Sequence, residues 1–368
     1  MRIQSIETIP VAVPLTKPFK TALRTVTTAY AIYVKITSVD GQIGWGEAPP
    51  THVITGDSLG SITYAIEEVI APLLIGKDLR NREEVFRLLK RSIVRNTSAK
   101  AAVDMAIHDL LGQLAGLPLY QLLGGFRDKI ETDFTVSVND AAEMADDAER
   151  YIADGFNVLK VKVGIGEIGE DIERIMAIRE RVGAGPKIRL DANQGWKPKE
   201  AVFAIGKMED AGLDIELIEQ PVAADDIEGL RYVTKHTLTP IMADESVFSA
   251  KDALRVLEMR AADLINIKLM KSGGIHEALK INALAETYGV ECMVGSMIET
   301  KLGITAAAHL AASQPNITRF DFDAPLMLAE DIVAGGITYD GRVIQLPKWP
   351  GLGLDQEGMG RIGKEEEH

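Results

Sequence analysis

The sequence predicts an α/β protein whose main part is a modified TIM-type (β/α)8 barrel of the form (β/α)7β, joined to an α+β capping domain. From Ile130 onward, short strand-like runs alternate with helical stretches, with a period of roughly 25–30 residues that suits a β/α unit. The segment before Ile130 is different, because alternating strands come first and helical runs follow. The 368 residues also exceed the usual length of a single domain.

Residues 1–125 are expected to form the capping domain, and Gly124-Gly125 marks its boundary. Strand alternation there is interrupted by polar loops, and Asp40-Gly41 marks a hairpin turn. Apolar residues at three-and-four spacing then predict helices. The expected elements are strands at 3–13, 30–37 and 43–47, loops at 17–25 and 49–57, and helices at 61–74, 81–94 and 98–114.

Residues 126–325 are expected to form the barrel, with residues 326–354 packing back on the capping domain and residues 355–368 as a disordered tail. A doubly wound open sheet is the alternative, but the strand-order reversal and the Gly-rich phosphate loop that usually mark it are not visible. The expected strands are 132–138, 158–163, 188–192, 215–219, 241–244, 264–269, 291–294 and 317–323, and the expected helices are 141–153, 172–182, 199–211, 227–234, 250–258, 275–288 and 304–312.

The composition disfavours several classes of partner. A net charge of −14 argues against nucleic acid, because phosphate binding needs a basic face. The first residues lack the apolar core of a signal peptide, and no apolar run is long enough to span a bilayer. We therefore expect a cytoplasmic protein without a membrane partner. The single cysteine, Cys292, rules out an intrachain disulfide and is expected to be a buried packing residue.

Lys160 and Lys162 lie in the second expected strand of the barrel. Because side chains alternate along a strand, both point to the same face. Two buried ammonium groups are costly unless carboxylates, a metal or a bound anion lie opposite. An exposed edge strand with two solvated lysines is the alternative. Acidic residues at the other strand ends favour the buried arrangement.

Asp191, Glu219 and Asp244 lie at the C-terminal ends of three successive strands, the end at which a barrel builds its site. Mg²⁺ prefers such hard oxygen ligands, whereas zinc prefers histidine or cysteine, and none of the six histidines lies at a strand end. A single acid of this kind often forms a salt bridge or a helix N-cap, and Glu245 is an alternative ligand one residue out of phase. Three acids beside lysines predict a magnesium site.

Lys162 and Lys268 lie on the second and sixth strands, which are opposed in an eight-stranded barrel. A substrate between them presents one face to each, as proton removal from one face and return to the other requires. Lysine has an ordinary pKa of about 10.4, which a neighbouring cation such as Lys160 and partial desolvation would lower. The metal would hold a carboxylate and stabilise the enediolate formed when the α-carbon loses its proton.

These motifs resemble the enolase superfamily, specifically its muconate-lactonizing-enzyme subgroup, over residues 1–354. The K-x-K motif and the opposite lysine carry the resemblance, and a lysine base with Mg²⁺ is known chemistry of this superfamily. The mandelate-racemase subgroup would need a histidine at the seventh strand, where residues 294–299 contain none. The resemblance implies acid/base catalysis by Lys162 and Lys268 and Mg²⁺ ligation by Asp191, Glu219 and Asp244.

Within the subgroup, the chain is most similar to bacterial epimerases of L-Ala-D/L-Glu dipeptides. The resemblance implies 1,1-proton transfer at the glutamate α-carbon in murein peptide recycling, and we expect a homo-oligomer. Asp321 and Asp323 would meet the free ammonium of the dipeptide, and Arg24 its distal carboxylate. The other implied substrate contacts are Thr135, Lys160, Ser296, Met297 and Ile298.

Several alternatives remain open. N-acylamino-acid racemase, o-succinylbenzoate synthase and cycloisomerases act on substrates without that ammonium, so Asp321 and Asp323 argue against them. An epimerase of other dipeptides and a non-catalytic barrel that binds acidic peptides are two more, although acids and bases at the strand ends disfavour the latter. Arg24 is alternatively a solvated loop residue, and the two aspartates alternatively brace Arg319.

Overall fold

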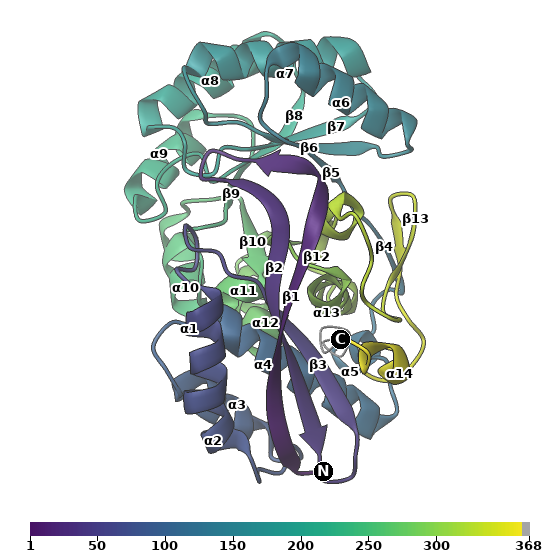
Figure 1. Cartoon of the computed structure of the whole chain (residues 1–368). Coiled ribbons are helices and arrows are strands. Elements are labelled where there is room, and N and C mark those ends of the chain that lie inside the picture. Colours follow the sequence, from purple (N-terminus) through teal and green to yellow (C-terminus); the bar gives the residue numbers. More distant parts are fainter. Residues whose placement is uncertain (363–368) are drawn as a thin grey trace.

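The computed structural model describes residues 1–362 and contains a capping domain and a barrel (Figure 1). The capping domain starts with an antiparallel sheet of β1 (Ile3–Lys20), β2 (Thr25–Ser38) and β3 (Ile43–Ala48). Strands β1 and β2 form a long hairpin that extends from this sheet to the barrel (Figure 1). The hairpin therefore brings N-terminal residues to the barrel strand ends.

The tip of this hairpin differs from the sequence prediction. We expected a polar loop over residues 17–25, but β1 continues to Lys20 and β2 begins at Thr25, so the turn contains only residues 21–24. Phe19 pairs with Val26 across the hairpin and packs against Ala29 and Ile298. Strand pairing and this apolar contact outweigh the polar composition of the segment.

The three helical runs of the capping domain occur where the spacing predicts them. The first is interrupted by one π-helical turn, and the last is buried along most of its length. The Ala-rich sequence of this last helix allows β3 to pack closely against it. The elements are α1 (Leu59–Tyr64), η1 (Ala65–Ile70), α2 (Ala71–Leu74), α3 (Arg82–Arg91) and α4 (Thr97–Ala115).

The barrel sheet has eight parallel strands paired in sequence order, and most of them are largely buried, as expected for strands covered on both faces. The fold class predicted from the periodicity is confirmed. The strands are β5 (Phe134–Val136), β6 (Val158–Lys162), β7 (Lys187–Asp191), β8 (Ile215–Glu219), β9 (Ile241–Ala243), β10 (Leu264–Lys268), β11 (Glu291–Gly295) and β12 (Ile317–Phe320).

Helices follow the barrel strands and cover the outside of the sheet (Figure 1). Each expected barrel helix is present, and one short helix directly after β10 was not predicted. None of the helices within residues 1–362 is both long and apolar enough to cross a membrane. The helices are α6 (Ala141–Ala153), α7 (Ile168–Val182), α8 (Pro198–Asp210), α9 (Ile227–His236), α10 (Ala250–Met259), α11 (Leu269–Ser272), α12 (Ile275–Thr287) and α13 (Lys301–Ser313).

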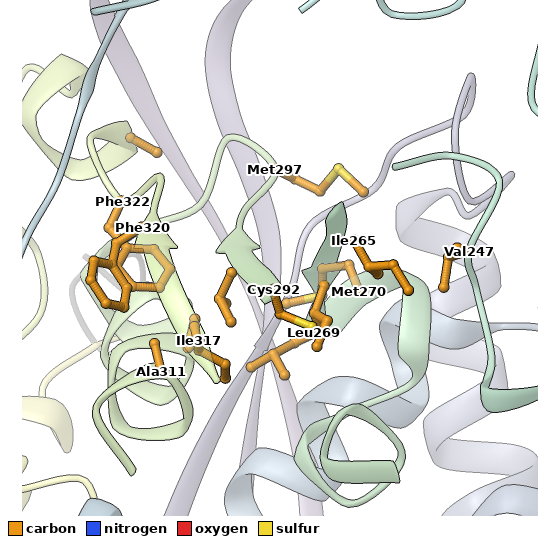
Figure 2. Close-up of a cluster of buried hydrophobic side chains, with 14 of the residues drawn as sticks. Val247, Ile265, Leu269, Met270, Cys292, Met297, Ala311, Ile317, Phe320 and Phe322 are labelled. Carbon is orange, nitrogen blue, oxygen red and sulfur yellow. The ribbon is translucent and has the colours of Figure 1, made fainter. Parts of the chain in front are cut away.

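A continuous apolar core lies between the barrel strands and their helices. Figure 2 shows part of it, where Ile265, Cys292 and Ile317 come from β10, β11 and β12. Cys292 is a free, buried thiol, and burial raises its pKa to about 12. The expectation that Cys292 is a packing residue rather than a nucleophile agrees with this environment.

The C-terminal segment joins both domains. Strands β13 (Thr338–Asp340) and β14 (Val343–Gln345) form a hairpin, and β14 pairs with β4 (Lys129–Glu131). The backbone N–H of Leu352 donates to Asp109 of α4 at 2.8 Å. The segment between β12 and β13 begins with a single 3-10 turn, η2 (Ala324–Met327).

The expectation of a disordered tail from residue 355 is wrong for residues 355–362. Helix α14 (Gln356–Met359) forms there, and Met359 is buried. Trp45 donates from Nε1 to Gln356 at 3.0 Å, which ties the helix to β3. Residues 363–368 lie outside the described residues.

The contact between β3 and α4 generates a stability prediction. A Cβ atom on Gly46 would overlap the carbonyl of Ala102, whereas one on Gly60 of α1 would meet nothing. We expect Gly46→Ala to reduce the free energy of unfolding by about 1–3 kcal/mol because of overpacking. Gly60→Ala should instead be neutral or stabilising by up to about 1 kcal/mol. Urea unfolding followed by circular dichroism measures both, and equal midpoints would contradict the close packing.

Candidate active site

Charged side chains lie together at the C-terminal ends of five consecutive barrel strands. The register places Lys162 of β6 beside Asp191 of β7, and Asp191 beside Glu219 of β8. Asp244 directly follows β9, and Lys268 ends β10. All of these side chains are buried, so each charge needs a compensating partner nearby.

The lysines bridge the carboxylates of neighbouring strands. Lys160 Nζ lies 2.8 Å from Glu219, 3.2 Å from Asp191 and 2.7 Å from Asp321. Lys162 Nζ lies 2.5 Å from the same Asp191 oxygen. The alternative of two solvated lysines on an edge strand is therefore wrong, because β6 pairs with a strand on each side and both lysines are buried.

On the opposite side, Lys268 Nζ lies 2.7 Å from Asp244 and 3.9 Å from Glu219. Burial lowers the pKa of Lys268, but the carboxylates of Asp244 and Glu219 outweigh this and raise the pKa above its ordinary value. Among protein groups alone, Lys268 is protonated at neutral pH, the form that can return a proton to carbon.

The three carboxylates have the donor chemistry of a magnesium site. Asp191, Glu219 and Asp244 come from adjacent strands, and all three are fully buried. The oxygens Glu219 Oε2 and Asp244 Oδ1 contact lysines but make no hydrogen bond of good geometry. Buried, under-satisfied carboxylate oxygens beside one another fit a hard divalent cation.

The ammonium groups lie between these acids. Within residues 1–362, no three His, Cys, Asp or Glu side chains already form a metal-binding group.

The pKa values of the acids are shifted in different directions by their neighbours. Burial and Asp191 raise the pKa of Glu219 to about 7, whereas Lys268 and Lys271 outweigh burial and hold the pKa of Asp244 below its usual range. Glu245 is also buried beside these acids, which together with burial raise its pKa to about 8, and it accepts a hydrogen bond from Asn193 at 3.2 Å.

One cavity brings the two opposed lysines together with every substrate contact implied by the sequence except Lys160. Residues of the hairpin tip and of the barrel strand ends form its walls. Lys160 lies beneath this cavity, in contact with Asp321. The predicted residues that line the cavity are Arg24, Thr135, Lys162, Lys268, Ser296, Met297, Ile298, Asp321 and Asp323.

The two aspartates after β12 have different partners. Asp321 pairs with Lys160, which lowers the pKa of its carboxyl despite burial. Asp323 accepts a hydrogen bond from the backbone N–H of Thr135 at 2.6 Å, and burial beside Asp321 raises its pKa to about 7. Neither aspartate braces Arg319, which instead contacts Glu216 and Glu291.

Arg24, in the hairpin turn, is a further basic group that lines the cavity. Its side chain is half-buried, and burial lowers its pKa. Among the residues that the structure describes, no carboxylate forms an ion pair with Arg24, although most other half-buried cations have one. The alternative of a fully solvated loop arginine does not fit this position.

Sequence reasoning missed several residues of the site. Phe19, Leu23 and Ile54 line the cavity from the capping domain, but their loops carried no periodic signal. Asn193 also lines the cavity, in the left-handed backbone region with φ 41°. Lys271 is buried on α11 and lies 2.6 Å from Asp244. Lys271 was missed because the short helix α11 was not predicted.

Two family models match the chain. Residues 4–124 match the mandelate racemase / muconate lactonizing enzyme N-terminal domain, and residues 143–357 match the enolase C-terminal domain-like family. Together they cover both the capping domain and the barrel. The two matched regions therefore include every residue of the cavity except Thr135, which lies between them.

Individual proteins are also similar over nearly the whole chain. The L-Ala-D/L-Glu epimerase of Bacillus subtilis (strain 168) is 64% identical over 354 residues, covering 96% of this chain and 97% of that protein. A hydrophobic dipeptide epimerase of Enterococcus faecalis is 46% identical over 356 residues, covering 96% and 99%.

Solved structures agree with the fold described above. A substrate-liganded complex of the B. subtilis L-Ala-D/L-Glu epimerase has a TM-score of 0.96, with 64% identity, and covers 96% of this chain and 99% of that chain. The E. faecalis dipeptide epimerase complexed with Mg and the dipeptide L-Leu-L-Tyr has a TM-score of 0.94, with 46% identity, and covers 97% and 100%. The chain therefore belongs to the mandelate racemase / muconate lactonizing enzyme family of the enolase superfamily.

Proposed function

We propose that this protein is a Mg²⁺-dependent epimerase of L-Ala-D/L-Glu dipeptides that acts in murein peptide recycling. Similar proteins are named as epimerases of dipeptides, which supports this class of isomerase reaction. The observation that carries the proposal is that Lys162 and Lys268 reach one cavity from opposed strands. A cytoplasmic location and a homo-oligomeric state remain predictions from the sequence.

Lys162 and Lys268 are the proposed acid/base pair. One lysine, as its neutral amine, takes the α-proton of the glutamate residue from one face and becomes an ammonium group. The other, as its ammonium form, returns a proton to the opposite face and becomes an amine. Contacts with Asp191 and Asp244 hold the two side-chain nitrogens at fixed positions. Such positioning supplies part of the rate enhancement, because the reacting groups need no search for alignment.

Asp191, Glu219 and Asp244 would hold the magnesium ion. When bound, Mg²⁺ would supply the positive charge that stabilises the enediolate formed by loss of the α-proton. The E. faecalis relative is described with Mg and a dipeptide, which supports this choice of cation. Asn266 donates to Glu219 Oε1 at 2.7 Å and so orients this carboxylate from β10.

The two ends of the cavity suit the two ends of an acidic dipeptide. Asp323 is buried, and the described residues offer it no ion pair, so a substrate ammonium would compensate its charge. Arg24 is the corresponding cation for the distal carboxylate of glutamate. Ser296, Met297 and Ile298 would contact the peptide between these ends.

Removal of either lysine tests the two-base reaction. We expect Lys162→Ala and Lys268→Ala each to lower the epimerisation rate of L-Ala-L-Glu by about 10²–10⁴-fold, because each serves one face. In D₂O, each variant should still exchange the α-proton of one epimer, and the two variants should differ in which epimer that is. Proton NMR measures both quantities. Lys187→Ala, an exposed lysine at the start of β7, is the control. Retained epimerisation in both variants would falsify the mechanism.

Removal of one carboxylate tests the magnesium site. We expect Asp244→Asn to weaken Mg²⁺ binding at least about tenfold, because one charged ligand is lost. Glu245→Gln should keep binding within about threefold of the parent, since this residue is the out-of-phase alternative. Isothermal titration calorimetry after EDTA dialysis measures binding, and added Mg²⁺ should restore activity. A larger loss in Glu245→Gln would move the ligand assignment to Glu245.

Variants at the two ends of the cavity test substrate recognition. With L-Ala-L-Glu, its N-acetyl derivative and L-Ala-L-Gln as substrates, Asp323→Asn should reduce only the preference for the free amine, by about tenfold. Arg24→Met should reduce only the preference for glutamate over glutamine, by about tenfold. The ratios of kcat/KM give both preferences. A parent enzyme that prefers the N-acetyl substrate would favour N-acylamino-acid racemisation instead.

A further inference from the structure

Glu47 of β3 is a fully buried carboxylate at the junction between the capping domain and the barrel. Its Oε1 accepts from the backbone N–H of Thr300 at 2.8 Å. Its Oε2 accepts from the Thr300 hydroxyl at 2.6 Å and from the backbone N–H of Gly303 at 2.8 Å. The Tyr33 hydroxyl of β2 lies 2.5 Å from the same Thr300 hydroxyl. Two strands of the capping domain thus bind one point on the barrel.

That point is the N-terminus of α13, where Thr300 is the N-cap residue. The first N–H groups of a helix lack intrahelical partners, and the helix dipole favours a negative charge there. Glu47 satisfies two of these N–H groups from another domain. Burial raises the pKa of Glu47 to about 7, and the hydrogen bonds from Thr300 and Gly303 oppose this rise.

A second buried carboxylate, Glu299, stabilises the turn directly before α13. Glu299 Oε1 accepts from the backbone N–H of Met297 at 2.8 Å. A Cβ atom on Gly303 would overlap Glu299 Oε2 and lie 3.1 Å from Glu47 Oε2, so the two acids meet over this glycine. The turn between β11 and α13 is therefore held from both of its sides, by Glu299 within the barrel and by Glu47 from the capping domain.

The segment 296–298 in this turn lines the cavity that contains both lysines. Met297 is also one of the buried residues of the apolar core (Figure 2). Apolar packing fixes where this segment lies, but it is not directional and does not fix the orientation of its backbone. The hydrogen bonds at Thr300 and Gly303 are directional and fix the first turn of α13, from which the segment continues.

We propose that Glu47 is a positioning residue for substrate binding: by capping α13 from the neighbouring domain, it holds residues 296–298 in the orientation that contacts the dipeptide. The inference rests on the proposed function of this segment. Glu47 itself does not line the cavity, so its effect on the substrate passes through Thr300. Because the contact between Glu47 and α13 joins two domains, it also makes the shape of the cavity depend on the position of the capping domain on the barrel.

Glu47→Gln tests this role. Glutamine keeps an oxygen for the Thr300 N–H, but its amide group would face the N–H of Gly303, so one hydrogen bond is lost. We expect the KM for L-Ala-L-Glu to rise about tenfold while kcat stays within about threefold, because substrate positioning is affected and the lysines are not. Hydrogen exchange of the backbone amides at 296–300 should become about tenfold faster, independently of any activity.

Asp109→Asn is the matched control. Asp109 is also a fully buried carboxylate of the capping domain and accepts from the backbone N–H groups of Trp45 and Leu352, at 3.1 and 2.8 Å. It does not contact residues 296–303. We expect this variant to lose stability like Glu47→Gln, with an unchanged KM and unchanged exchange at 296–300. Exchange should instead increase near Leu352.

A second pair of variants gives an answer if Glu47→Gln does not fold. Thr300→Val removes the hydroxyl that contacts Glu47 and Tyr33, whereas Thr300→Ser keeps it. We expect the valine variant to show the raised KM and faster exchange at 296–300, and the serine variant to resemble the parent. Parental exchange at 296–300 in both Glu47→Gln and Thr300→Val, or the same increase in Asp109→Asn, would overturn the inference. Failure of the parent to epimerise any dipeptide would count against the proposed function alone.

Discussion

Compensation of buried charge at the ends of the barrel strands is the constraint on which the site depends. Lys160, Lys162 and Lys268 are removed from water together with the acids at the C-terminal ends of β7, β8 and β9. Each ammonium group would be prohibitively costly alone, and each carboxylate likewise. The register of the parallel sheet sets these groups at adjacent positions, so the fold supplies the partners that the charges need. Removal of any one of these side chains would leave the charges of its neighbours without a partner, so the lysines and carboxylates depend on one another.

The periodicity of the sequence was sufficient to predict the barrel and the positions of these charged residues, because strand alternation and strand order directly determine which side chains meet. The hairpin tip and residues 355–362 were predicted incorrectly for the opposite reason. Phe19 is held in a strand by its pairing with nearby Val26 and by its contact with Ile298, which is distant in sequence. Helix α14 is held by Trp45, which is also distant in sequence. Composition alone makes both segments look like polar loops. The contact between Glu47 and the barrel could not be predicted either, because nothing in the local sequence Trp45-Gly-Glu47 indicates Thr300 as a partner.

The two domains contribute different parts of the site. The barrel provides the lysines and the acids on rigid strands, and the capping domain provides Arg24, Leu23 and Ile54 on loops. Carboxylates join the domains: Glu47 caps α13, and Asp104 of α4 accepts from the N–H groups of Ile275 and His276 at the start of α12. Both helices begin shortly after segments that carry residues of the cavity. The interface between the domains therefore has a direct connection to the cavity wall.

Asp321 and Asp323 lie beyond the end of β12, and Arg24 lies in a four-residue turn, whereas Lys162 and Lys268 are part of regular strands. Turns tolerate replacement and changes of length far better than paired strands do. Natural variation in such a scaffold can therefore exchange residues in the turns that line the cavity while leaving the buried lysines on the strands unchanged. The same division marks out the turns as the place to begin when redesigning this enzyme for a new peptide.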